Sequence, residues 1–434
     1  MPRRLDIAAA GFETDFAALL AGAGDAAGEV ADRVAAIIAE LRAGGDAALI
    51  ALTEKFDRCR LDAADLRVPD AEIDAALAGC PADLRAALEV AARRIDDYHA
   101  RQMPDDIDYR DAAGVRLGAR WRPLSAVGVY VPGGRAAYPS SVLMNALPAR
   151  IAGVGRVAMV VPAPDGVLNP LVLAAARIAQ VDEVYRVGGA QAVAALAFGT
   201  ETIAPVDKIV GPGNAYVAEA KRQVFGTVGI DMIAGPSEIL VVADADNDPA
   251  WIAADLLSQA EHDPDARAIL IADDPAFADA VETAIAGHLA TLPRAETARA
   301  SWEANGAVIL VGGLDEAPAL IDRLAPEHLE LAVAEPEALA ARITHAGAIF
   351  LGRYTPEAIG DYVAGPNHVL PTARSARFAS GLSVLDFLKR TSLIGCDADG
   401  LAALAPAAAT LARAEGLDAH ALSLEIRLNR RGET

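Results

Sequence analysis

Short runs rich in valine and isoleucine alternate with amphipathic helical patterns from about residue 124 onward. This alternation is typical of βα units, in which helices connect the strands of a parallel sheet. The expected strands of a first group are 126–131, 157–162, 184–187 and 208–210. Those of a second group are 239–243, 268–272, 307–311, 329–333 and 348–351. Parallel strands have to be covered by helices, so the sequence predicts an α/β fold.

Helical patterns flank these strands on both sides. Apolar residues recur at spacings of three and four over 29–42 and 82–102, and a last helical stretch covers 401–431. A chain of 434 residues is too long for one compact core, so we expect several domains. They are an N-terminal helical segment (1–25), a larger α/β domain built from 26–125 and 238–380, an α/β domain inserted into it (126–237) and a C-terminal helical segment (381–434).

The charge of the chain excludes several classes of partner. Its formal net charge is −22, its sequence pI is near 4.7, and lysine and arginine form no basic patch. Nucleic acids and anionic membrane surfaces repel such a chain, so neither is an expected partner. No apolar stretch approaches the roughly 20 residues of a membrane span. Acidic residues also interrupt the N-terminal region, which predicts no signal peptide.

The cysteines indicate a compartment and narrow the choice of metal ligands. Cys59, Cys80 and Cys396 are scattered and odd in number. This usage fits the reducing cytoplasm, and it favours neither a disulfide framework nor a cysteine-rich zinc site. A metal in this protein would therefore need histidine, carboxylate or amide ligands.

Three strands of the first group run into glycine before a polar or helical segment. These junctions are 128–135, 187–191 and 209–214. Glycine there lets a ligand approach the backbone, and the following helix N-terminus offers free N–H groups to an anion. Any tight βα turn also uses glycine, so a single junction is equally compatible with an ordinary turn. Three junctions in one sheet favour a nucleotide or similar ligand, although the G-x-G-x-x-G fingerprint is absent.

Gln259 and His262 stand three residues apart near the end of an expected helix that begins after Asp248. At this spacing the two side chains share one face of the helix. Such a histidine, beside amide and carboxylate groups, is either a polar cap at a helix end or part of a metal or polar substrate site.

Glu327 and His328 are adjacent and precede an expected strand. A carboxylate and an imidazole in neighbouring positions can serve two successive proton transfers. The alternative is a solvated glutamate next to a capping histidine, and this motif alone does not separate the two interpretations.

Two further segments carry polar side chains that suit a metal site. Asp361 and His368 belong to a turn-rich loop, and Glu415 and His420 lie around a break in the last helical stretch. A set of nitrogen and oxygen ligands suited to zinc would be Gln259, His262, Asp361 and His420. The sequence spacing leaves open whether these side chains converge.

Taken together, these segments resemble the histidinol dehydrogenase family over nearly the whole chain. The segments that carry the resemblance are 127–134, 188–192, 210–214, 234–238, 255–262, 326–328, 360–362, 367–368, 415–417 and His420. The resemblance implies two incomplete Rossmann-like domains with small terminal segments that swap between the protomers of a homodimer. It also implies that 126–237 binds NAD and that 381–434 contributes to the partner's site.

The resemblance further assigns roles to individual residues. The implied ligands of one Zn²⁺ per subunit are Gln259, His262, Asp361 and His420, the last supplied across the dimer interface. The implied acid–base pair is Glu327 and His328. The implied substrate-binding residues are Ser237, Gln259, His262, His328, Asp361, His368, Glu415 and His420. The implied NAD-binding residues are Tyr130, Gln191 and Asn214.

The implied reaction is the oxidation of L-histidinol through L-histidinaldehyde to L-histidine with two NAD⁺, the last steps of histidine biosynthesis. The nearest alternative is a related zinc- and NAD-dependent dehydrogenase of another small polar alcohol. The carboxylate of Glu415 suits a cationic amine and favours histidinol. A zinc hydrolase without NAD would not need the glycine junctions, and a non-catalytic binding protein would not need the Glu327–His328 pair.

Overall fold

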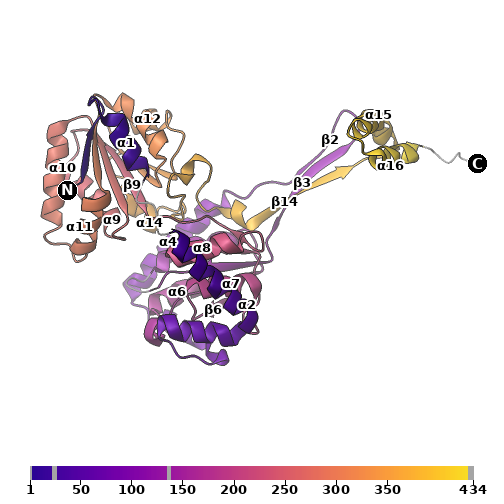
Figure 1. Ribbon diagram of the computed structural model, residues 1–434, viewed down its shortest axis with the longest axis horizontal. Coiled ribbons are helices and arrows are strands. Elements are labelled where there is room, and N and C mark those ends of the chain that lie inside the picture. Colours follow the sequence, from indigo (N-terminus) through magenta and orange to yellow (C-terminus); the bar gives the residue numbers. More distant parts are fainter. Residues whose placement is uncertain (1, 22–26, 134–137, 429–434) are drawn as a thin grey trace, which may run out of the picture. The chain divides into compact units, whose positions relative to one another are not determined.

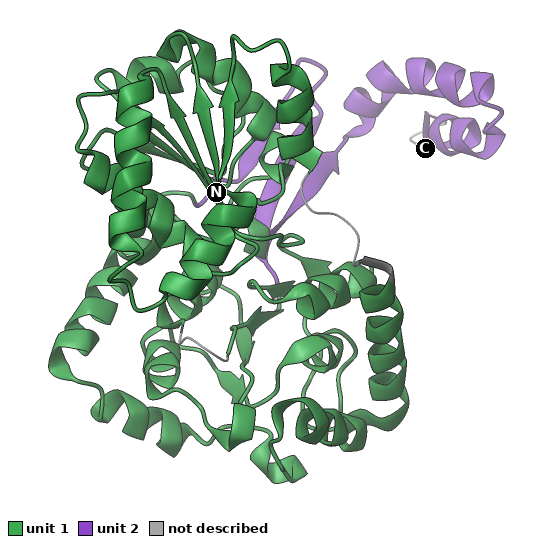
Figure 2. Ribbon diagram, turned by 60° about the vertical axis from the view of Figure 1, so that its left-hand side comes forward, with its two compact units in different colours: residues 1–102, 125–387 green, residues 103–124, 388–434 purple. Residues whose placement is uncertain are grey.

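The computed structural model describes residues 2–21, 27–133 and 138–428. The chain divides into two compact units, which Figure 2 shows in different colours. The first, unit 1, comprises residues 1–102 and 125–387, and the second, unit 2, comprises residues 103–124 and 388–434. Unit 1 contains two parallel sheets, and unit 2 contains a small antiparallel sheet with two helices.

Six parallel strands of unit 1 form a sheet with the order β1-β11-β10-β9-β12-β13. The strands are β1 (Arg3–Asp6), β9 (Glu238–Ala243), β10 (Arg267–Ala272), β11 (Ala307–Leu310), β12 (His328–Ala332) and β13 (Ala348–Leu351). The expected strands of the second group are confirmed. β9 and β12 are buried along their whole length, which explains why these strands are recognisable as continuous apolar runs.

Helices cover both faces of this six-stranded sheet. One face packs on α9 (Pro249–Ala260), α10 (Pro275–His288) and α11 (Ala295–Asn305). The other packs on α1 (Phe12–Ala21), α12 (Ala317–Leu324) and α13 (Pro336–Ala340). In Figure 1, α9, α10 and α11 lie on one side of β9, and α1 and α12 lie on the other. Along β9, Ile239 and Val241 face the first set and Leu240 and Val242 the second, as the period of two requires.

The N-terminal segment 1–25 differs from the expected helical segment. Its first residues form β1, which pairs in parallel with β11, and Leu5 and Phe16 belong to the core of the six-stranded sheet. β1 has a single buried side chain, because it lies at the edge of the sheet. So short a strand carries no apolar run that could reveal it in the sequence.

Five parallel strands form the second sheet of unit 1, with the order β6-β5-β4-β7-β8. They are β4 (Ala126–Tyr130), β5 (Arg156–Val160), β6 (Glu183–Tyr185), β7 (Lys208–Val210) and β8 (Gly229–Ile230). The helices between them are α5 (Pro139–Ile151), α6 (Pro170–Ile178), α7 (Gly189–Phe198) and α8 (Ala215–Val224). The expected strands of the first group are confirmed, and β8 is an additional short strand.

Three helices near the N-terminus pack against the helices that connect the strands of the five-stranded sheet. They are α2 (Ala27–Asp57), α3 (Asp70–Ala78) and α4 (Ala82–Ala100). Leu41 and Leu49 of α2 share a core with Tyr130 and Leu196. The sequence interpretation placed 26–125 with 238–380, and Arg94 of α4 also donates to the carbonyl oxygens of Val363 and Ala364, so these contacts do not assign the helices to one domain. Amphipathic spacing shows which face of a helix is buried but not which sheet it covers, so the expected domain limits remain a proposal.

Unit 2 consists of a three-stranded antiparallel sheet and a helical hairpin. The strands β2 (Ile107–Arg110), β3 (Arg116–Pro123) and β14 (Leu388–Gly395) have the order β14-β3-β2. The helices are α15 (Ala398–Ala414) and α16 (Asp418–Leu428), and Gly416 between them has a φ of +74°. The segment 381–434 was expected to be helical, and β14 corrects this. Most of β14 is exposed, so no apolar alternation marks it. In the described residues, no helix has the length and hydropathy to span a membrane.

Candidate active site

His328 is the first residue of β12, and its imidazole is buried among carboxyl groups. Nδ1 lies 3.0 Å from the carbonyl oxygen of Glu238, so a proton on Nδ1 donates to that oxygen. Nε2 lies 3.5 Å from Asp361 Oδ1 and has no hydrogen-bond partner. A histidine with one nitrogen fixed by a carbonyl and the other free is set up to accept a proton at the free nitrogen. Because His328 is only 4% exposed, a capping histidine at the surface is excluded.

Three carboxyl groups lie within 3.6 Å of the His328 ring. Glu327 Oε2 is 3.6 Å and Glu357 Oε1 3.4 Å from Nδ1, and Asp361 approaches Nε2. Burial lowers the pKa of the imidazole, but the charges of Glu357, Glu327 and Asp361 outweigh burial and raise it well above its ordinary value. The interpretation of Glu327 as a solvated glutamate is wrong, since its side chain is buried and accepts a hydrogen bond from the Glu238 N–H at 2.8 Å.

The pKa values of the same carboxyl groups are shifted from their ordinary values. Burial raises the pKa of Glu327 to about 7 and that of Glu357 to about 8. Burial also acts to raise the pKa of Asp361, but the facing His328 ring lowers that pKa below the ordinary value. Several buried carboxylates beside one imidazole are costly unless a cation compensates them. Ligand atoms of His328, Glu357 and Asp361 lie within 4.8 Å of one another, so these residues form a possible metal-binding group.

Gln259 belongs to the same cluster through the end of α9. Asp248 caps this helix, as expected, and its side chain accepts from Ala250 N at 2.8 Å. The Gln259 side chain is fully buried, and its amide group donates to the Glu357 carboxylate. Ser258 Oγ also donates to Glu357 at 3.1 Å. The C-terminal end of α9 therefore holds one edge of the carboxylate cluster.

His262 follows α9. Burial lowers the pKa of its ring, and among the nearby charges Asp361 acts to raise this pKa and His328 to lower it. His368 lies on the other side of Asp361, where its Nδ1 is 3.0 Å from the Asp361 carbonyl oxygen and its Nε2 is 3.4 Å from Ser141 Oγ. Ser237 is half-buried and immediately precedes β9. Unit 1 therefore brings together Gln259, His262, Glu327, His328, Asp361 and His368, while Ser237 is placed only by its position before β9.

Glu415 and His420 lie in unit 2. Glu415 follows α15, His420 belongs to α16, and both are exposed. The packing within unit 1 does not test their expected roles, so these roles remain predictions.

Three glycine-rich junctions follow strands of the five-stranded sheet. The Tyr130 hydroxyl at the end of β4 accepts a hydrogen bond from Gly189 N, at the start of α7, at 3.0 Å. Gln191 in α7 is 1% exposed, and its Nε2 has no hydrogen-bond partner. Asn214 caps α8, where its Oδ1 accepts from Tyr216 N and Val217 N. The carboxyl ends of β4, β6 and β7, in one parallel sheet, thus carry or lead into all three residues of the expected NAD set. Residues 134–135 of the first junction lie outside the described residues.

Glu357 is the main site residue that the sequence interpretation missed. It begins the short helix α14 (Glu357–Tyr362), four residues before Asp361. A spacing of four puts both carboxylates on one face of a helix, and this spacing is the signal that could have identified Glu357. Glu238, whose carbonyl oxygen contacts His328 and whose N–H donates to Glu327, carries no such signal.

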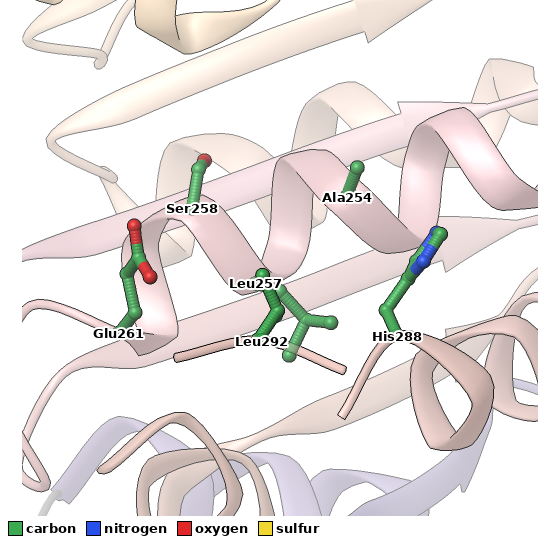
Figure 3. Close-up of a pocket in the computed structure, with 6 residues that line it drawn as sticks. All are labelled: Ala254, Leu257, Ser258, Glu261, His288 and Leu292. Atoms are coloured by element: carbon green, nitrogen blue, oxygen red, sulfur yellow. The ribbon is translucent and has the colours of Figure 1, made fainter. Parts of the chain in front are cut away.

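A pocket of about 200 Å³ lies beside α9 but outside this cluster. Its lining comes from α9 and from α10 with the turn after it, as Figure 3 shows. The residues are Ala254, Leu257, Ser258, Glu261, His288 and Leu292. No expected site residue lines it, although Ser258 connects it to Glu357 through the hydrogen bond described above.

The sequence model described as "Histidinol dehydrogenase" matches residues 22–428. The chain belongs to the histidinol dehydrogenase family. It is 67% identical to "Histidinol dehydrogenase" of Rhodospirillum rubrum over 99% of both chains. It is 62% identical to that of Gluconobacter oxydans, over 99% of this chain and 100% of the relative. The crystal structure of histidinol dehydrogenase from Elizabethkingia anophelis has a TM-score of 0.94 to this chain at 35% identity, with 98% of each chain covered. The family resemblance inferred from the sequence motifs is thereby confirmed.

Proposed function

We propose that the protein oxidises L-histidinol through L-histidinaldehyde to L-histidine, with two NAD⁺ as hydride acceptors. One observation carries this proposal. In a chain of the histidinol dehydrogenase family, the buried His328 has an unpartnered Nε2, and Glu327, a second candidate for proton transfer, lies 3.6 Å from the Nδ1 side of the same ring. A four-electron oxidation at one site needs two proton acceptors, one for the alcohol and one for the water that hydrates the aldehyde.

The chemistry of the donor set supports one Zn²⁺ per subunit. Gln259, His262 and Asp361 of one protomer and His420 of its partner would hold the ion, and the uncompensated carboxylates around His328 favour a cation there. When bound, zinc would orient the imidazole and amino groups of the substrate. Glu357 accepts hydrogen bonds from Gln259 and Ser258 and so holds the amide ligand in place.

In its neutral form, His328 would take the proton of the alcohol at Nε2, while its Nδ1 stays fixed on the Glu238 carbonyl oxygen, and a bound cation that compensates the nearby carboxylates would favour this neutral form. Glu327 would take a proton from the water that adds to the aldehyde. Both side chains are buried, so the reactive aldehyde would be kept from bulk water between the two oxidations. Ser237, His368 and Glu415 would complete the substrate site, with the Glu415 carboxylate against the cationic amine.

The five-stranded sheet would bind NAD⁺ through Tyr130, Gln191 and Asn214. The unpartnered Nε2 of Gln191 and the N-terminus of α7 offer donors to a polar ligand at the ends of these strands. These donors lie where open parallel sheets commonly bind nucleotides.

A homodimer is proposed because helices of unit 2 expose large apolar side chains. Leu411 is 64%, Leu422 60% and Ile426 58% exposed. Exposed apolar clusters of this kind mark protein–protein contacts, and the swap of terminal segments would bring His420 and Glu415 to the partner's site. The three cysteines are unpaired, which fits the proposed cytoplasmic location.

The proposal is tested by steady-state kinetics on zinc-loaded protein with NAD⁺. L-Histidinol is compared with amino alcohols that lack the imidazole and with imidazole alcohols that lack the amine. We expect NADH formation with L-histidinol and a kcat/KM lower by at least about a hundredfold for either group of analogues, because each loses a buried polar contact. Efficient oxidation of another polar alcohol, with none of L-histidinol, would instead identify a related dehydrogenase.

A further inference from the structure

The junction between β7 and α8 begins with a glycine that no other residue can replace without strain. Gly211 has a φ of +110°, and a Cβ atom added to it would lie 2.1 Å from the carbonyl oxygen of Tyr130. Three residues later Asn214 caps α8. The Gly211 peptide therefore sets the path of the chain from the sheet to the first turn of α8.

Both polar groups of the Gly211 backbone are held by one buried ion pair. The Gly211 N–H donates to Asp231 Oδ2 at 2.8 Å, and Lys221 Nζ donates to the Gly211 carbonyl oxygen at 2.9 Å. Lys221 and Asp231 form a salt bridge with each other, and their side chains are only 2% and 1% exposed. The second Asp231 oxygen also accepts from Met232 N at 2.6 Å.

The ion pair joins three elements around the junction. Lys221 is on α8, two turns beyond Asn214, and Asp231 directly follows β8, which pairs with β7. Burying two charges is costly, and apolar side chains of similar volume commonly stabilise a fold as well or better. Besides the Met232 N–H, the pair holds both backbone polar groups of Gly211, which belong to the two peptide groups on either side of its Cα, so its specific effect is on the conformation of the junction.

We propose that Lys221 and Asp231 are positioning residues for the dinucleotide. They fix the Gly211 peptide, and with it Asn214 and the N-terminal turn of α8, in the conformation that receives NAD⁺. This inference rests on the proposed NAD-dependent function. Both side chains are buried, so they act through the Gly211 peptide and not as part of an exposed binding surface.

The first variant is Lys221→Met, which removes the donor to the Gly211 carbonyl oxygen and keeps most of the side-chain volume. If only about a tenth of the molecules keep the binding conformation, the apparent Kd for NAD⁺ rises about tenfold. We expect this rise in both Kd and KM for NAD⁺, with kcat at saturating NAD⁺ and KM for L-histidinol within about twofold of the unmodified protein. The matched control is Arg222→Met, which removes the neighbouring exposed cation, paired with Glu219, and should leave all these values unchanged.

The second variant separates positioning from stability. In Lys221→Met/Asp231→Asn no unpaired charge remains buried, and the side-chain amide oxygen introduced at position 231 can still accept from the Gly211 N–H. The Tm of this variant should therefore recover toward that of the unmodified protein. Its Kd for NAD⁺ should stay at least about fivefold raised, because the Gly211 carbonyl oxygen still lacks its donor.

Two results would overturn the inference. One is a Kd for NAD⁺ in Lys221→Met that equals that of the Arg222→Met control. The other is recovery of both Tm and NAD⁺ affinity in the double variant, which would make the pair purely structural. NAD⁺ binding and NADH formation by the unmodified protein are measured first. If these are absent, the proposed function fails and this inference fails with it. If they are present and only the variants are unaffected, this inference alone fails.

Discussion

Replacing His328 with asparagine separates the proposed proton acceptor from the proposed metal ligands. The asparagine side-chain amide can still donate to the Glu238 carbonyl oxygen in place of Nδ1, but it has no group at the position of Nε2. We expect His328→Asn to fold and to bind zinc and NAD⁺ but to oxidise L-histidinol very slowly.

The size of the effect follows from the role assigned to Nε2. A positioned acid–base group contributes about 10²- to 10⁴-fold to a rate. This corresponds to about 3 to 5 kcal/mol of transition-state stabilisation at about 1.4 kcal/mol for each factor of ten. The cost to folding should be far smaller, about 1 kcal/mol or less, because the buried hydrogen bond to Glu238 is kept.

The assay compares kcat for L-histidinol, zinc content and Tm in His328→Asn and in a control, His345→Asn. His345 is half-buried, its backbone N–H donates to Asp322 at 2.9 Å, and it is none of the expected site residues, so its replacement should leave kcat unchanged. The reasoning would be refuted by a variant that keeps more than about a tenth of kcat. A loss of zinc in His328→Asn would refute the proposed set of zinc ligands, which does not include His328. Such a loss would favour the group formed by His328, Glu357 and Asp361 as the metal site, in place of the proposed ligands.

Three further predictions concern the same site. Glu327→Gln should slow the oxidation of L-histidinaldehyde by at least about a hundredfold, measured as NADH formed from the aldehyde, while the first oxidation is less affected. The rate of the aldehyde step should rise with pH up to about 7 and then level off. The reason is that burial raises the pKa of Glu327 to about 7, and only the ionised carboxylate accepts a proton. A pH–rate profile of the unmodified protein without this rise would contradict the assignment. Removal of metal by a chelator should abolish activity and lower Tm, and Zn²⁺ should restore both, because Glu357 and Asp361 would otherwise lack a compensating cation; an unchanged Tm would argue against a metal in this cluster.

The sequence predicts the buried strands well because burial on both faces makes them continuous apolar runs, as in β9 and β12. Edge and exposed strands lack this signature. β1 has one buried residue and β14 has none, and both fall in segments that were expected to be helical. The contacts of α2 to α4 with the helices of the five-stranded sheet were not predicted, because an amphipathic pattern shows which face of a helix is buried but not which element it packs against.

The candidate site was predictable where chemistry-bearing residues are adjacent or share a helical face. Glu327 and His328 could be recognised in this way, and so could Gln259 with His262. Their convergence could not, because it depends on Glu357 of α14, which contacts both Gln259 at the end of α9 and His328 at the start of β12. Glu357 accepts hydrogen bonds from Gln259 and Ser258, and only the folded chain reveals these contacts.

The number of NADH molecules formed for each L-histidinol consumed tests the central claim most directly. Purified, zinc-loaded protein is given a limiting amount of L-histidinol and excess NAD⁺, and NADH absorbance is followed to completion together with the amount of L-histidine. A single site that carries out both oxidations predicts two NADH and one L-histidine for each L-histidinol. One NADH with accumulation of the aldehyde, or no NADH at all, would contradict the account.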